Sequence, residues 1–309
     1  MAILAMIYGR LDEERGIADS VISYANSACV NIFGDLRGQT IKSLLCEIAG
    51  STEVMEGWVK DLELSGSLMI EGELKGRFVK YHSVLGEDNL KSDSRRGRFI
   101  QAAITDITES VILKERVYGT SEALKRVASA ADEDTGKHVA RINLYSEHLA
   151  ELMGLDDQFV EDISRFAQLH DIGKIQVLDL IRKPDKLTDS EFEEVKKHTV
   201  YGAKIVEGLP GMEMAYNIAL EHHERWDGSG YPEGKAGEEI SIEGRIVALG
   251  DVFDALIFAR AYKPSISPEK VFDIFKQGDG RVMPTHFDPR VHQCFLKRFD
   301  DFVDIARIS

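Results

Sequence analysis

The sequence predicts two domains joined by a helix: an α+β domain over residues 1–108, a linker helix over 109–131 and an all-α helical bundle over 132–309. A chain of 309 residues suits two domains of ordinary size better than one. Strand-like and helical runs alternate in the first part, whereas the periodic runs after residue 131 are helical. Eight of the nine histidines lie after residue 137, which indicates that the chemistry belongs to the bundle.

Charge and composition exclude several classes of protein. Lys and Arg number 38 against 53 Asp and Glu, a net charge of −15, so we expect no basic face for coating DNA, although a nucleotide substrate remains possible. No apolar run approaches the roughly 18 residues that span a membrane, and the first residues lack the basic start of a secretory signal. The three scattered cysteines, Cys29, Cys46 and Cys294, are typical of reduced thiols, so we expect a cytoplasmic protein.

The first domain is expected to carry small helices on one face of an antiparallel sheet. Asn26 is expected to cap a short helix that ends at Gly34. A second helix is expected at 39–48, where apolar residues recur at helical spacing. The expected strands cover about 3–8, 20–25, 67–74, 77–85 and 97–106, with connectors rich in Gly, Asp, Asn and Ser.

Two stretches of this domain resemble a PAS domain: ISYANSACVNIFG, and the exit from the last strand, AAITDITE at 102–109. The resemblance covers about the first 108 residues and implies a ligand-binding or cofactor-binding sensor that often dimerises. The helix at 39–48 has no histidine for a haem, and Cys46 lacks the sequence context of a flavin photosensor, so the ligand is unknown. An unrelated α+β domain is the alternative.

The linker carries apolar residues at alternating spacings of four and three, which are typical of a coiled-coil seam. One interpretation is a parallel coiled coil that joins two protomers into a homodimer and carries a signal between the domains. The other is a single amphipathic helix packed on the next domain. The seam positions are Leu113, Val117, Thr120, Leu124, Val127 and Ala131.

The bundle is expected to begin near the run DTGKH, and its helices deliver histidines and aspartates to one another. Gly173 is expected to let the chain turn, and Asp189 or Ser190 to cap the helix that carries His198. The remaining expected helices are about 138–153, ending at Gly154; 157–170, delivering His170 and Asp171; 213–225, bearing His222 and His223; and 245–258, with Asp251 and Asp254 on one face.

A His-Asp dipeptide such as His170-Asp171 is by itself more often an ordinary surface or core pair than a metal ligand. This chain, however, has four imidazoles and two carboxylates on distant segments: His170, His198, His222, His223, Asp171 and Asp251. Together they form the ligand set of a multi-metal hydrolytic site, because imidazole binds transition metals and a carboxylate can bridge two of them. The pair His222 and His223 would splay by about 100° on a regular helix, so either the metals lie between them or one is structural.

The runs HDIGK, HHERWDGSGYPEG, RIVALGDVFDAL and HFDP, in this order, resemble the HD-GYP family of the HD phosphohydrolase superfamily over about residues 132–295. The resemblance implies a cyclic di-GMP phosphodiesterase with two or three metals, usually iron or manganese, in which a bridging hydroxide attacks the phosphodiester. It also implies a possible diguanylate-cyclase-type protein partner at the GYP loop. Carried over by motif, the metal ligands are His138, His170, Asp171, His198, His222, His223 and Asp251; the substrate contacts are Lys174, Tyr231, Arg260 and Lys263; and the catalytic residues are Asp171 as the bridge, Lys174 beside the leaving group and Asp254 beside the metal-bound water.

Two departures from the family pattern affect the expectations. The polar residue and the proline usual after DAL are replaced by Ile257 and Ala261, which puts substrate choice in doubt more than metal binding. Asp134 stands where the family often has Glu with a third metal, and its side chain is shorter by one methylene. We therefore expect two metals with His138 as the weakest ligand, unless a small helix shift restores the reach of Asp134.

The leading expectation is a cyclic dinucleotide phosphodiesterase regulated by its N-terminal domain. The sequence does not separate cyclic di-GMP from a mixed GMP-AMP cyclic dinucleotide, nor a linear product from GMP. Two other classes remain: a non-catalytic receptor that binds the dinucleotide or a protein, and an HD-type di-iron oxygenase.

Overall fold

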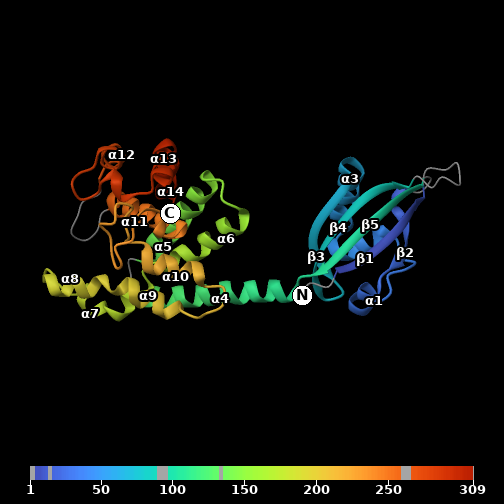
Figure 1. Ribbon diagram of the computed structural model, residues 1–309, viewed down its shortest axis with the longest axis horizontal. Coiled ribbons are helices and arrows are strands. Elements are labelled where there is room, and N and C mark those ends of the chain that lie inside the picture. Colours follow the sequence, from blue (N-terminus) through green and yellow to red (C-terminus); the bar gives the residue numbers. More distant parts are fainter. Residues whose placement is uncertain (1–3, 13–15, 89–96, 132–134, 259–265, 309) are drawn as a thin grey trace. The chain divides into compact units, whose positions relative to one another are not determined.

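The computed structural model describes residues 4–12, 16–88, 97–131, 135–258 and 266–308. The chain divides into two compact units, residues 1–115 and 116–309, each with its own hydrophobic core (Figure 1). None of the described helices is both long enough and apolar enough to cross a membrane.

The first unit is built on an antiparallel sheet of five strands in the order β2-β1-β5-β4-β3 (Figure 1). Its inner face is apolar, and one cross-strand row joins Ile70, Tyr81 and Ile104, all buried. The sheet confirms the five expected strands, although the first two are longer than expected. The strands are β1 Leu4–Asp12, β2 Gly16–Ala25, β3 Ser67–Leu74, β4 Arg77–Asp88 and β5 Gly97–Asp106.

Three helices contribute apolar side chains to the core against this sheet: α1 Ser27–Phe33, α2 Ile41–Ala49 and α3 Thr52–Ser65. Asn26 caps α1 as expected, since its side chain accepts a hydrogen bond from the backbone of Cys29. The helix α3 was not expected. It buries only Met55 and Leu62, so its apolar periodicity is weak, although Ser51 caps its start.

Helix α4, Thr108–Ala131, begins in the first unit and continues into the second. Beyond Arg116 it packs on the second core through one face, which includes Val117 and Leu124. Val127, three residues after Leu124, remains half exposed. Over this stretch two of the six proposed seam positions, Val117 and Leu124, are covered by the chain's own second unit.

The second unit is a helical bundle, and its described residues contain no strand apart from one isolated bridge between Asp227 and Ala236. Its main core brings together α5, α6, α10, α11, α12, α13 and α14. The helices are α5 Thr135–Leu152, α6 Asp157–Phe166, α7 Leu178–Ile181, α8 Asp189–Lys196, α9 His198–Val206, α10 Glu213–Glu221, α11 Ile242–Ile257, α12 Pro268–Gln277, α13 Pro289–Lys297 and α14 Phe299–Ile308.

Three helix boundaries differ from the expectation. The helix expected at 157–170 ends at Phe166 and tightens into a 3₁₀ turn before His170. The helix expected to carry His198 is broken at Lys197, and its cap is Thr188 in a capping box with Glu191 rather than Asp189 or Ser190. The helix bearing His222 and His223 ends at Glu221, not at 225. In each case the regular helix stops within four residues of a predicted metal ligand.

Candidate metal centre

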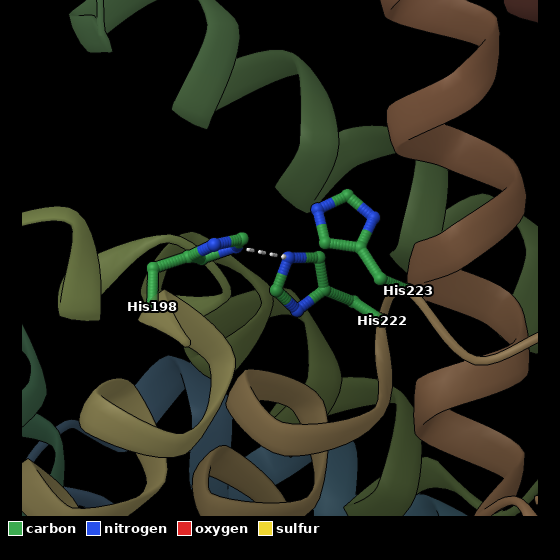
Figure 2. A group of neighbouring side chains, drawn as sticks. All are labelled: His198, His222 and His223. Atoms are coloured by element: carbon green, nitrogen blue, oxygen red, sulfur yellow. Dashed lines mark hydrogen bonds between the residues drawn. The ribbon is translucent and has the colours of Figure 1, made fainter. Parts of the chain in front are cut away.

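The predicted donors form two groups, and within each group the ligand atoms lie within 4.8 Å of one another. One group is made by three histidines from the start of α9 and the end of α10 (Figure 2). The other combines side chains from α5, the turn after α6, and α11. The first group is His198, His222 and His223, and the second is His138, His170 and Asp251.

The early end of α10 explains how two adjacent histidines serve one group. His222 is the residue at which the helix stops, and the chain then turns so that the backbone of Tyr231 donates to the carbonyl of His223 at 3.1 Å. The two imidazole rings lie 4.1 Å apart between centroids, where a continuing helix would have splayed them (Figure 2). Both rings therefore face His198.

Three imidazoles have their Nδ1 atoms engaged by backbone carbonyls. His170 donates from Nδ1 to the carbonyl of Ala167 at 2.9 Å, and His198 donates to the carbonyl of Val195 at 2.7 Å. His222 likewise donates from Nδ1 to the carbonyl of Ile218 at 3.0 Å. Because a carbonyl only accepts, the proton of each neutral ring must sit on Nδ1, and each Nε2 carries a lone pair.

These lone pairs face one another. Nε2 of His138 lies 3.3 Å from Nε2 of His170, and Nε2 of His198 lies 3.3 Å from Nε2 of His222. Two lone pairs at this distance repel, and a cation bound between them turns the repulsion into coordination. The donor set therefore fits a divalent transition metal in each group.

Asp171 stands between the two groups. Its Oδ1 lies 3.4 Å from Nε2 of His198 and its Oδ2 lies 3.1 Å from Nε2 of His170. One carboxylate thus offers one oxygen to each group, which is the arrangement of a bridging ligand. The Nζ of Lys174 also donates to Oδ2, at 2.5 Å.

The electrostatics keep most of these groups in the forms that bind metal. Burial lowers the pKa of His222 well below its usual value and lowers the pKa of His223 to about 3, so both imidazoles are neutral. Burial alone would raise the pKa of Asp171, but Lys174 and His170 outweigh it, so the pKa falls and the carboxylate is ionised. Burial alone would lower the pKa of His170, yet Asp171 raises it.

The sequence led us to expect Asp254 beside a metal-bound water, and in the structure both of its oxygens are engaged by protein side chains. It is buried and accepts a two-pronged bond from Arg141, at 2.6 and 2.9 Å, and a bond from Nδ1 of His138 at 2.7 Å. These contacts orient His138, as a carboxylate behind a metal-binding histidine does. His138 was expected to be the weakest ligand because the Asp134 side chain is short, yet Asp254 gives it a carboxylate partner.

Arg141 was missed by the sequence analysis, although a signal was present, since it lies three residues after His138 on the same face of α5. Its guanidinium is buried, pairs with Asp254 and stacks over the ring of Phe258 at 3.7 Å. Phe258 is the residue at which α11 ends, as expected. Arg141 therefore joins the histidine helix to the end of the helix that carries Asp251.

Gly173 allows the two halves of the centre to approach, rather than letting the chain turn. A Cβ atom at this position would overlap the carbonyl oxygen of His198 and the backbone nitrogen of Gly202. The backbone of α9 therefore crosses directly over the turn that follows Asp171, and only glycine leaves room for it.

Tyr231 lies at the edge of the centre, with its ring 4.8 Å from the ring of His223. Glu224, another residue that the sequence analysis missed, stabilises the loop that carries Tyr231. This buried carboxylate accepts from the backbone of Glu233 at 2.7 Å and of Gly234 at 3.1 Å.

Three further predicted residues, Asp134, Arg260 and Lys263, lie outside the described residues.

The fold and the donor set define a helical bundle whose core holds a two-part histidine and carboxylate centre for divalent metals. Residues 122–291 match the HD domain family, and the chain belongs to it.

Several curated proteins are similar to this region. A cyclic di-GMP phosphodiesterase of Vibrio cholerae is 41% identical over 200 residues, which cover 60% of this chain and 40% of that protein. A cyclic di-GMP phosphodiesterase of Thermotoga maritima is 40% identical over 189 residues, 60% of this chain and 50% of that one. A 3'3'-cGAMP-specific phosphodiesterase of Vibrio cholerae is 39% identical over 195 residues, 62% of this chain and 36% of that one. The chain thus spans half or less of the length of these relatives.

Proposed function

We propose that this chain hydrolyses a phosphodiester bond of a cyclic dinucleotide, cyclic di-GMP or a mixed GMP-AMP cyclic dinucleotide. The observation that carries the proposal is Asp171, whose two oxygens lie between the two donor groups. The names of the relatives support the reaction and both candidate substrates.

The chemistry follows from the charge of the substrate. A phosphodiester resists hydrolysis because its anion repels an anionic nucleophile. Two divalent cations, when bound, supply charge neutralisation and a water that deprotonates near neutral pH. Iron and manganese are the metals we propose, since imidazole and carboxylate donors suit both.

The chain's own residues are proposed to do the rest. Asp171 offers one carboxylate oxygen to each donor group. Lys174 keeps an ammonium group beside Asp171 that can offset charge on the phosphate or protonate the leaving 3′ oxygen. The Lys174 side chain is about one-third exposed, at 32%, so a substrate can reach it. Arg260 and Lys263 are proposed as further phosphate or guanine contacts.

The N-terminal unit is proposed to be a PAS-like sensor over 1–108, followed by the linker helix 109–131 and the HD-GYP domain 132–309. The antiparallel sheet packed by helices supports this, as does one contact of α4. The buried Gln168, two residues before His170, donates to Ser121 at 3.0 Å and to Glu122 at 3.0 Å. A shift of α4 would act directly on the turn that carries the shared ligand.

The remaining proposals concern partners and location. We propose a homodimer through the first unit and the exposed side chains of α4. We also propose a diguanylate-cyclase-type partner at the GYP loop and a cytoplasmic location. The receptor and the oxygenase are the competing functions, and the complete donor set argues against a protein that only binds.

The test is a metal count and a substrate assay on anaerobically purified protein, with each cyclic dinucleotide resolved by chromatography. We expect about two metals per chain and a linear dinucleotide or GMP as product. Asp171→Ala should lose metal and turnover together, while Asp179→Ala, an exposed aspartate eight residues on, should keep both. Oxygen consumption without phosphodiester cleavage would favour the oxygenase, and binding without cleavage would favour the receptor.

A further inference from the structure

A lysine held between two aromatic rings lies beside the proposed centre. The Nζ of Lys196 is 5.3 Å from the ring centroid of Phe192 on α8 and 5.4 Å from that of Tyr231 on the loop after α10. Both distances are within the range of a cation–π contact. We call these three residues the aromatic clamp.

The clamp is continuous with the metal centre. Tyr231 packs on His223, and Lys196 lies two residues before His198, so each side of the clamp adjoins a ligand of the same donor group.

Phe192 has no evident role in holding the fold. Its side chain is 50% exposed, and α8 contributes no buried residue to the domain. A large aromatic ring left in solvent next to a metal centre is a surface on which a planar ligand can stack. Most residues around it in α8 are acidic or polar, so the ring is an isolated apolar face rather than part of an apolar patch.

Lys196 is partnered in a way that a phosphate can replace. Its Nζ donates to the carboxylate of Glu193 at 2.6 Å, one turn earlier on α8. The Glu193 side chain is 65% exposed, and an exposed pair of this kind contributes little stability. An incoming phosphodiester offers the same charge, with two acceptor oxygens.

We propose that Phe192 and Lys196 form a second subsite of the cyclic dinucleotide, in which Phe192 stacks on one purine base and Lys196 binds the phosphate that is not cleaved. The inference rests on the proposed function. A cyclic dinucleotide has two bases and two phosphates, and a centre that holds only the reacting phosphate leaves the other half without contacts. The clamp supplies a stacking face and a cation at the edge of the centre.

The test compares two substrates. Cyclic di-GMP carries the bases and the second phosphate, whereas bis(p-nitrophenyl) phosphate carries neither. Phe192→Ala should raise KM for cyclic di-GMP by about 5- to 150-fold, the loss expected when one base loses its aromatic partner. Phe192→Trp should preserve KM, and Phe192→Leu, which keeps apolar bulk without a π face, should behave like alanine. The kinetics of bis(p-nitrophenyl) phosphate should stay unchanged in all three.

Lys196→Ala should raise KM for cyclic di-GMP about tenfold and make it less sensitive to salt. The matched control is Lys197→Ala, because Lys197 makes the same one-turn pair with Glu194 at 2.6 Å and is exposed. Metal content should stay at the wild-type value in every variant, which separates a substrate contact from damage to the centre.

The outcomes are distinct. Wild-type protein that cleaves neither cyclic di-GMP nor the mixed dinucleotide overturns the proposed function, and this inference with it. Wild-type protein that cleaves the dinucleotide while Phe192→Ala and Lys196→Ala keep the wild-type KM overturns this inference alone. Equal losses on both substrates also overturn it, because they would indicate damage to the centre.

Discussion

At the residue scale, the hydrogen-bond partners of Asp254 indicate that it orients a histidine of the proposed centre. Both of its oxygens are engaged by Arg141 and His138 inside the protein. A carboxylate of this kind fixes the tautomer and the orientation of the histidine in front of it, and its loss typically costs 10- to 100-fold in metal affinity.

We therefore expect Asp254→Ala to lose about one of two metals per chain, the one held by His138, His170 and Asp251, while the histidine group at α9 and α10 keeps its own. The guanidinium of Arg141 would also be left buried without its partner, at a cost of about 3–5 kcal/mol in the free energy of unfolding. Elemental analysis and thermal unfolding measure the two effects. Full metal content with a fall in kcat alone would instead return Asp254 to the water-orienting role expected from the sequence.

At the element scale, α4 is packed against its own chain at some positions and exposed at others. Leu124 packs against the core of the second unit, whereas Val127 and Leu113 are about half exposed. A homodimer formed along this helix must use side chains that are exposed, such as Leu113 and Val127, since Leu124 is already packed by the chain itself.

We expect Leu124→Glu to lower the free energy of unfolding by about 2–4 kcal/mol, because it forces a charge toward an apolar core. Val127→Glu should leave the melting temperature unchanged and, if the protein is a dimer through this face, should split it. Light scattering beside thermal unfolding separates these results. A wild-type monomer, or a Val127→Glu dimer as tight as the wild type, would contradict dimerisation through α4.

At the scale of the whole molecule, the two units have separate hydrophobic cores, and the donors of the proposed centre belong to the second. Bound metal raises the free energy of unfolding only of the unit that contains it. The increase is about 4 kcal/mol when the free metal concentration is a thousand times the dissociation constant.

Removal of metal by a chelator should therefore shift one thermal transition of the full chain and leave the other in place. The stabilised transition should fall because the imidazole nitrogens that face one another at 3.3 Å would repel once the cation is gone. Differential scanning calorimetry of the full chain, with and without chelator and after metal is restored, measures this. Two transitions that move together, or none that move, would contradict a metal centre confined to the bundle.

The sequence by itself determined most of the helices and strands, although not α3, and the proposed donor residues that come together. Alternating apolar residues specify the strands, because side chains of a strand point to opposite faces. Asn26 and Gly154 mark helix ends through local hydrogen bonding and a left-handed backbone, so both could be predicted from their neighbours. The seven proposed metal donors were predicted from the family resemblance that the motifs carry, and the described structure brings all seven together.

Only the tertiary structure decided how those donors are held. The bond between His138 and Asp254 joins residues 116 apart, and the place of Gly173 beneath α9 depends on a helix that begins 25 residues later. The breaks in the helices at Phe166, Lys197 and Glu221 follow from the need to aim several imidazoles at common points, which a regular helix cannot do. Such constraints arise between segments that are distant along the chain, so local propensity and spacing carry no record of them.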